Sequence, residues 1–177
     1  MCTLTALASA VAHCRRIDNS PREVTIKGRR VGYKTILVAS DGSTLAKRAV
    51  EHASEIAKLT GGQLSVVTVS NPPPTFSAAE IGWSVPGNVY EQIAAADKAT
   101  AEQIFAQAKS ASAVALASTL HIRNDSPAAG IMEAAQTLGA DLIVMGSHGH
   151  SGLNKLLLGS QATKVLALAT CPVLIVK

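Results

Sequence analysis

Apolar positions along the chain follow two alternating patterns from about residue 33 onward. Short runs rich in β-branched and other apolar residues are typical of buried strands. Five such runs occur, at residues 33–40, 63–70, 114–123, 141–145 and 173–176. Between them, apolar residues recur at i, i+3, i+4 and i+7 spacing, which indicates helices with one buried face. The pattern therefore predicts strands that alternate with helices.

The predicted helices carry recognisable ends. Glycine at Gly61 is expected to end the first helix, and Gly139 is expected to end the third. Asn88, followed three positions later by Glu91, resembles an N-cap with its capping-box partner and predicts the start of a long second helix. The proline- and glycine-rich residues 71–87 before it are expected to be irregular.

Strands that alternate with helices predict an α/β fold. We expect an open five-stranded parallel sheet with strand order 3-2-1-4-5 and helices on both faces, a Rossmann-like arrangement. The nearly continuous apolar strands agree with burial on both sides. Residues 33–177 form the predicted domain, and residues 1–32 form a basic N-terminal extension, either loosely ordered or folded as a short helix.

Charge and composition narrow the possible functions. The net charge is +4, but residues 1–33 hold six basic and two acidic side chains, while the rest holds ten of each. The main domain therefore carries no electrostatic footprint for nucleic acid, and any polyanion affinity would lie in the extension. No apolar run approaches the roughly 18 residues that span a membrane, so no membrane association is expected.

The cysteines and histidines favour neither disulfides nor metal. Cys2, Cys14 and Cys171 are widely spaced, which predicts no disulfide framework and is consistent with a reducing cytoplasm. We interpret Cys171 as structural. His148 and His150 have no third ligand close by in the sequence and are expected to be solvent-facing loop residues. Aromatic residues make up only 3% of the chain, so the core is expected to consist of Ala, Val, Leu and Ile.

Candidate chemistry concentrates in two loops. Ligands of open parallel sheets bind beyond the carboxyl ends of the strands, where the strand order reverses. The sequence "ASDGS" follows the first strand, and "GSHGHSGLNKLLLGS" follows the fourth. Gly146 and Gly149 permit conformations and a closeness of approach that a Cβ would forbid. Gly159 and Ser160 begin the last helix, whose free N–H groups favour an anion such as phosphate. Alternatively, Ser160 is only an N-cap and the glycines are only loop residues.

The spacing Gly146-x2-Gly149-x9-Gly159-Ser160, together with "ILVASDGS" and "CPVLIVK", resembles the universal stress protein family. The resemblance covers residues 33–177, and the glycine pattern looks like the ATP-binding branch of that family. Two positions depart from the family pattern. Ser40 stands where an apolar residue is usual, and Gln161 stands where a small or β-branched residue is common. Neither change removes a donor from the expected phosphate site.

The resemblance implies contacts at nine positions, which are Ala39, Asp41, Val69, Met145, Gly146, Gly149, Gly159, Ser160 and Gln161. Asp41 would hold the ribose or adenine side, and Val69 with Ala39 would line the adenine pocket. Met145 and Gly146 would form the floor. Gly149, Gly159, Ser160 and the backbone of Gln161 would surround the phosphates. The implied ligand is ATP, ADP or AMP, accompanied by Mg²⁺.

From the residues alone, purely structural roles for the first loop remain open. Asp41 could simply cap the first helix, and Ser43 is expected to be a cap and not a ligand contact. Measured binding and measured stability of an Asp41 variant would separate the two roles.

The leading interpretation is an ATP-binding regulatory protein of stress adaptation, read by an unidentified protein partner. One alternative is a slow ATPase or nucleotidyl-transfer enzyme that uses the same crevice. The sequence offers no convincing general base or carboxylate pair for metal-assisted hydrolysis, so no catalytic residue is assigned. The other alternative is a dimeric interaction module without nucleotide, which the intact glycine pattern argues against.

The last strand predicts self-association. Residues 173–176 are four apolar residues between Pro172 and Lys177, and strand order 3-2-1-4-5 leaves this strand at the sheet edge. Soluble proteins usually protect such an edge. Antiparallel pairing with the same strand of a second copy would form a homodimer, an arrangement that the family resemblance also implies. The alternative is a helix that covers the edge.

Overall fold

The computed structural model describes the chain outside residues 1–24, 27–28, 31, 74–86 and 150–157. Within the predicted extension, two short described strands pair antiparallel, β1 (Thr25–Ile26) and β2 (Arg29–Arg30). The regular part of the chain begins after them.

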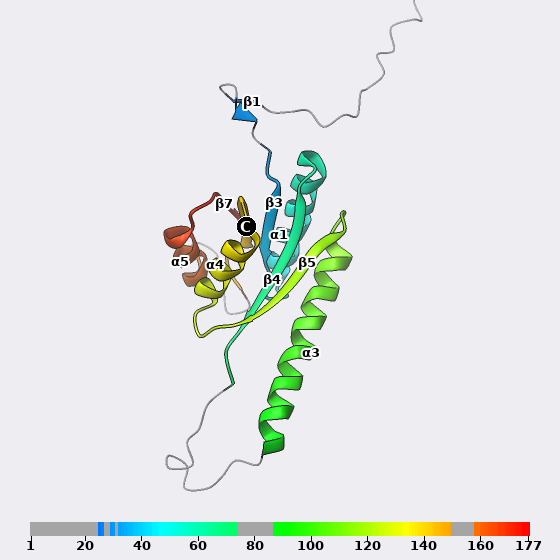
Figure 1. Ribbon diagram of the computed structural model, residues 1–177, viewed down its shortest axis with the longest axis vertical. Coiled ribbons are helices and arrows are strands. Elements are labelled where there is room, and N and C mark those ends of the chain that lie inside the picture. Colours follow the sequence, from blue (N-terminus) through cyan, green and yellow to red (C-terminus); the bar gives the residue numbers. More distant parts are fainter. Residues whose placement is uncertain (1–24, 27–28, 31, 74–86, 150–157) are drawn as a thin grey trace, which may run out of the picture.

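Five parallel strands form the central sheet, in the order β5-β4-β3-β6-β7. They are β3 (Thr35–Ala39), β4 (Gln63–Ser70), β5 (Leu116–Arg123), β6 (Leu142–Gly146) and β7 (Val173–Val176). When the five strands of this sheet are numbered 1 to 5 along the chain, starting at β3, their order is the predicted 3-2-1-4-5. The predicted α/β fold is therefore confirmed. The direction of strand succession reverses at β3, so β3 and β6 flank the switch point of the sheet (Figure 1).

Helices cover both faces of the sheet. They are α1 (Thr44–Thr60), α3 (Gly87–Ala111), α4 (Pro127–Leu138) and α5 (Ser160–Leu168). The first two lie against one face, and α4 and α5 lie against the other (Figure 1). None of the described helices is both long and apolar enough to cross a membrane.

Helix ends agree with the sequence at three positions and differ at one. Ser43 caps α1, since its Oγ accepts a hydrogen bond from the N–H of Ala46 at 3.2 Å. Gly61 and Gly139 end α1 and α4 in the left-handed conformation, with φ of 66° and 61°. The predicted N-cap at Asn88 is wrong. Helix α3 already begins at the preceding residue, so Asn88 lies within the helix and cannot be the half-in residue before it.

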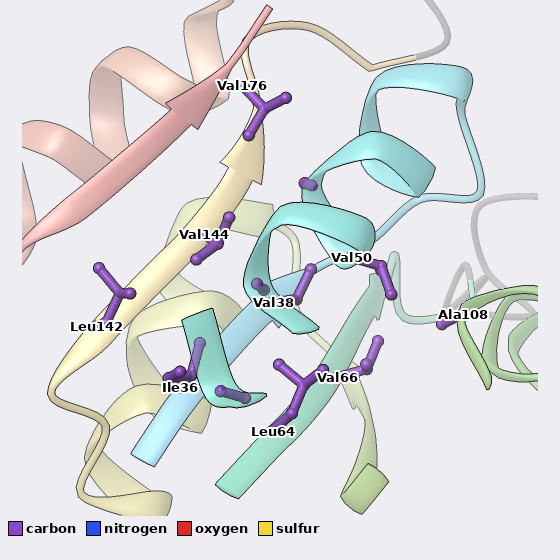
Figure 2. Close-up of a cluster of buried hydrophobic side chains, with 12 residues drawn as sticks. Ile36, Val38, Val50, Leu64, Val66, Ala108, Leu142, Val144 and Val176 are labelled. Atoms are coloured by element: carbon purple, nitrogen blue, oxygen red, sulfur yellow. The ribbon is translucent and has the colours of Figure 1, made fainter. Parts of the chain in front are cut away.

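The core consists of aliphatic side chains, as the low aromatic content predicts. Figure 2 shows the cluster between α1 and the sheet, in which Val50 of the helix faces Val38 and Val66 of neighbouring strands, all fully buried. Buried alanines on the same helix face let α1 approach the strands closely. A second cluster lies under α4 and α5. This two-sided core fixes the carboxyl ends of the strands relative to one another.

One carboxylate joins the amino ends of two neighbouring strands. Asp141, just before β6, accepts hydrogen bonds from the backbone N–H groups of Lys34 at 2.7 Å and Thr35 at 3.1 Å. The register of β3 against β6 is therefore fixed at the edge of the sheet opposite to the predicted ligand crevice.

Candidate functional site

Three apolar residues that were predicted to contact the ligand lie near the carboxyl ends of their strands. Ala39 is the register partner of Met145 on one side and of Val67 on the other. Val69 stands two positions beyond Val67 on β4. Met145 is buried, whereas Ala39 and Val69 are partly buried and pack against the cluster under α4 and α5. These side chains form an apolar wall beside the switch point.

The loop after β3 is a tight turn that presents Asp41. The N–H of Ser40 donates to the carbonyl of Val67 at 2.9 Å, and its Oγ accepts from the N–H of Gly42 at 3.3 Å. Gly42 is left-handed, with φ of 82°. Asp41 is exposed, and its Oδ1 accepts from the N–H of Ser43 at 3.0 Å. Ser43, and not Asp41, is therefore the cap of α1, while Oδ2 of the Asp41 carboxylate lies against Gly149 of the second loop.

The loop after β6 is anchored at Ser147. The N–H of this buried residue donates to the carbonyl of Val176 on β7 at 2.8 Å, and its own carbonyl accepts from the N–H of Gly159 at 2.9 Å. Its hydroxyl lies 3.2 Å from Nδ1 of His148. Ser147 thus joins the end of β6, the edge strand and the start of α5.

The predicted glycine pattern contributes three described glycines, Gly146, Gly149 and Gly159. None is left-handed, a conformation that occurs at Gly42, Gly61 and Gly139 among the described glycines.

What Gly146, Gly149 and Gly159 share is a close neighbour at the position where a Cβ would stand. A Cβ at Gly146 would lie 3.0 Å from Cβ of Leu45, one at Gly149 would overlap Oδ2 of Asp41, and one at Gly159 would lie 2.8 Å from the carbonyl oxygen of Ser147. Gly146 thus packs against the start of α1, Gly149 lies against the Asp41 carboxylate of the first loop, and Gly159 lies against the backbone of its own loop.

Helix α5 begins at Ser160, after the loop that follows β6. Gly159 is the N-cap residue, so Ser160 is the first helical residue and the alternative role of Ser160 as N-cap is wrong. No side chain of the described residues caps this end. The side chain of Gln161 turns to α4, where its Oε1 accepts from the N–H of Ala128 at 3.3 Å. The first-turn N–H groups of α5 therefore carry partial positive charge and no side-chain cap from the described residues.

The structure brings most of the nine predicted residues together at one edge of the sheet. Asp41 meets Gly149, Ala39 pairs with Met145, and Gly159 bonds to Ser147 next to Gly146. Cys2, Cys14, His150 and most of residues 71–87 lie outside the described residues. An apolar wall, a carboxylate and an open helix N-terminus thus converge at the switch point.

A polar cluster that the sequence analysis missed lies on the opposite face, between α3 and the ends of β4 and β5. Oδ2 of Asp97 accepts from Nε of Arg123 at 2.9 Å and from Oγ of Ser70 at 3.1 Å. Oγ of Ser70 also lies 2.8 Å from Nε2 of His121. The same ring nitrogen lies 3.5 Å from the Asp97 carboxylate, so serine and aspartate face one nitrogen and do not form a nucleophile relay. The neighbouring strand ends were visible in the sequence, but the helix partner was not.

This cluster holds Asp97 in its charged form. Burial alone would raise the pKa of its carboxyl group. Hydrogen bonds from Arg123 and Ser70 and the positive charges of His121 and Arg123 outweigh burial, so the pKa lies below its usual range. A groove of about 620 Å³ lies beside the cluster between α3 and β5, lined in part by Phe105 and His121. None of the nine predicted residues lines this groove.

Cys171 keeps a protonated thiol. Burial raises the pKa of Cys171, and the negative charge of Asp141 raises it further. Because the thiolate is the reactive form of cysteine, this environment agrees with a structural role.

An open parallel α/β sheet whose strand order reverses between β3 and β6 defines a Rossmann-like fold. The chain belongs to the universal stress protein family, whose model matches residues 32–177. The match covers all five strands of the central sheet.

Individual relatives agree with this family. The universal stress protein in the QAH/OAS sulfhydrylase 3′ region of Thermus aquaticus is 37% identical over 145 residues, which cover 82% of this chain and 99% of the relative. The solved structure of universal stress protein UspA from Lactobacillus plantarum has the same fold, with a TM-score of 0.68 at 24% identity over 84% of this chain and all of that one. A crystal structure of a universal stress protein in complex with cAMP has a TM-score of 0.57 at 28% identity, and the match covers 82% of this chain and 97% of that one.

Proposed function

We propose that the protein binds an adenine nucleotide at the carboxyl ends of β3 and β6 and acts as a regulatory protein of stress adaptation. The observation that carries the proposal is the contact between the two loops, in which the backbone of Gly149 lies against the carboxylate of Asp41. This contact leaves a carboxylate and a stretch of backbone within reach of one ligand.

Each part of a nucleotide has matching chemistry in the crevice. The apolar wall of Ala39, Val69 and Met145 suits an adenine ring. The exposed carboxylate of Asp41 is an acceptor for ribose hydroxyls. The first turn of α5 suits phosphate, because no side chain of the described residues caps its N–H groups and the helix dipole favours an anion. Mg²⁺ would be held chiefly by the phosphates.

Two further observations support an adenine nucleotide. Of the glycines that the family pattern places around phosphate, Gly149 lies against the Asp41 carboxylate of the first loop, and Gly159 lies against the backbone carbonyl of Ser147 in its own loop. The related universal stress protein that is 28% identical to this chain was crystallised with cAMP. The favoured ligand is ATP, with ADP and AMP as the alternatives.

The test is to denature freshly purified protein and identify the released small molecule by mass spectrometry. Calorimetric titration with ATP, ADP and AMP then ranks the three nucleotides. We expect one adenine nucleotide per chain. Absence of released nucleotide, with no binding of any of the three by the emptied protein, would refute the proposal. Release of inorganic phosphate from ATP in the presence of Mg²⁺ would favour the alternative of a slow ATPase.

We also propose that the protein forms a homodimer through β7. The strand pairs with β6 along one edge, and no other described strand pairs with its second edge. Leu174 in its middle is 37% exposed. Antiparallel pairing of β7 with the same strand of a second copy satisfies the backbone groups of this edge and buries Leu174.

A further inference from the structure

Gln161 joins the N-termini of the two helices on one face of the sheet. Its Oε1 accepts from the N–H of Ala128 at 3.3 Å, so a residue of α5 caps α4. Helix α4 lacks a cap of its own, because Ser126 in the N-cap position makes no side-chain hydrogen bond to it. Pro127, the first helical residue, has no N–H. The N–H of the fully buried Ala128 is therefore the first donor of α4, and Gln161 satisfies it.

Helix α4 lies directly on the apolar wall of the crevice. Two residues beyond Ala128, the backbone of Gly130 approaches Val69 so closely that a Cβ would lie 2.8 Å from Cγ1 and 2.9 Å from Cγ2. The same Cβ would lie 3.3 Å from Cγ2 of Ile122 on β5. With no free space at this contact, a shift of the start of α4 moves the Val69 side chain.

We propose that Gln161 is a positioning residue for the base of the bound nucleotide, an inference that rests on the proposed function. Its backbone belongs to the first turn of α5, at the phosphate end of the crevice. Its side chain fixes the start of α4, and Gly130 of that helix fixes Val69 at the adenine end. A single residue thus connects the phosphate end of the crevice with its base end. A small or β-branched residue at position 161 lacks the reach for this link.

Two probes measure binding at the two ends of the crevice separately. Adenosine reports on the apolar wall, and inorganic tripolyphosphate reports on the N-terminus of α5. Gln161→Met keeps the length of the side chain and removes the acceptor. We expect the Kd for adenosine to rise about fivefold relative to the Kd for tripolyphosphate, the equivalent of one hydrogen bond. Gln161→Glu keeps an acceptor oxygen and is expected to retain the wild-type Kd for adenosine. Adenosine is the probe for this variant because a carboxylate at position 161 repels phosphate.

Gln136→Met is the matched control, since it makes the same chemical change on the exposed face of α4. We expect its ratio of the two Kd values to equal that of the wild type. A proportional change of both Kd values in Gln161→Met would indicate general destabilisation and overturn the inference, as would an unchanged Kd for adenosine. If the wild-type protein bound ATP but neither probe, this inference would be overturned while the proposed function stood; if it bound no adenine nucleotide at all, both would fail.

Discussion

The backbone of Gly149 lies against the carboxylate of Asp41, and a Cβ at position 149 would overlap Oδ2. The two residues belong to loops that follow different strands, β3 and β6. Gly149 is not left-handed, so the glycine serves this contact and not an unusual backbone conformation. The contact places the Asp41 carboxylate beside the backbone of the second loop.

Replacement of Gly149 by valine tests this relationship. The new side chain must displace the Asp41 carboxylate, so Gly149→Val is expected to raise the Kd for ATP by roughly tenfold or more, the loss of a charged hydrogen bond. Stability should change little because Gly149 is exposed. Calorimetry measures the Kd, and Gly32→Val is the control, since a Cβ at Gly32 has no neighbour within 4 Å. Unchanged affinity in a folded Gly149→Val protein would contradict the assignment.

Asp41 and Ser43 separate ligand binding from helix capping. Asp41→Ala is expected to cost roughly 1.5–3 kcal/mol of ATP binding, because it removes a charged acceptor. Ser43→Ala removes the bond to the N–H of Ala46 and is expected to cost about 1 kcal/mol of stability while the Kd for ATP stays at its wild-type value. Urea unfolding and calorimetry on both variants provide the comparison. An Asp41→Ala protein that loses stability alone would show that the carboxylate only supports the turn.

The β7 edge predicts the mass of the protein in solution. Light scattering at micromolar concentration is expected to give the mass of two chains. Leu174→Arg is expected to give the mass of one chain, since two copies of a buried charge would face each other across the two-fold axis. Leu59→Arg, on α1 at a side chain that is 70% exposed, is the control and should remain dimeric. A wild-type mass of one chain would rule out the proposed dimer.

The Asp97 cluster predicts a dependence of stability on acid. The folded state lowers the pKa of Asp97, so its carboxylate stabilises the fold above the ordinary carboxyl pKa of about 4. This contribution is lost as the pH falls through the lower pKa of the folded state. Asp97→Asn is expected to cost about 1–2 kcal/mol at pH 7, and the difference from wild type should shrink below about pH 4. Urea unfolding between pH 3 and 7 measures it, and a difference that stays constant over this range would contradict the prediction.

Much of the fold was predictable because its signals are local. The apolar run at residues 63–70 coincides with β4, and Gly61 and Gly139 end their helices as the sequence indicates. Asn88 misled the prediction, since a cap-like residue followed by glutamate is equally acceptable inside the first turn of a helix. The start of α3 was set one residue earlier, at Gly87.

The candidate site was predictable only in part. The "ASDGS" stretch and the glycine spacing indicated the two loops, but the meeting of Gly149 with Asp41 depends on how β3 and β6 are paired. Asp97 was invisible in the sequence because its partners come from strands whose register, with a shift near Ser65, is set by the whole sheet. Likewise, the bond from Ala128 to Gln161 arises from the packing of two helices and has no local signal.

The hydrogen bonds from Lys34 and Thr35 to Asp141 join residues separated by 107 and 106 positions in the chain. During synthesis, β3, β4 and β5 all precede β6 in the chain, so these three strands leave the ribosome before β6 does. The strand at the centre of the finished sheet is therefore an edge strand for much of translation. Such non-local pairing slows folding, and until β6 pairs with it the unpaired side of β3 is an edge of the kind that favours aggregation.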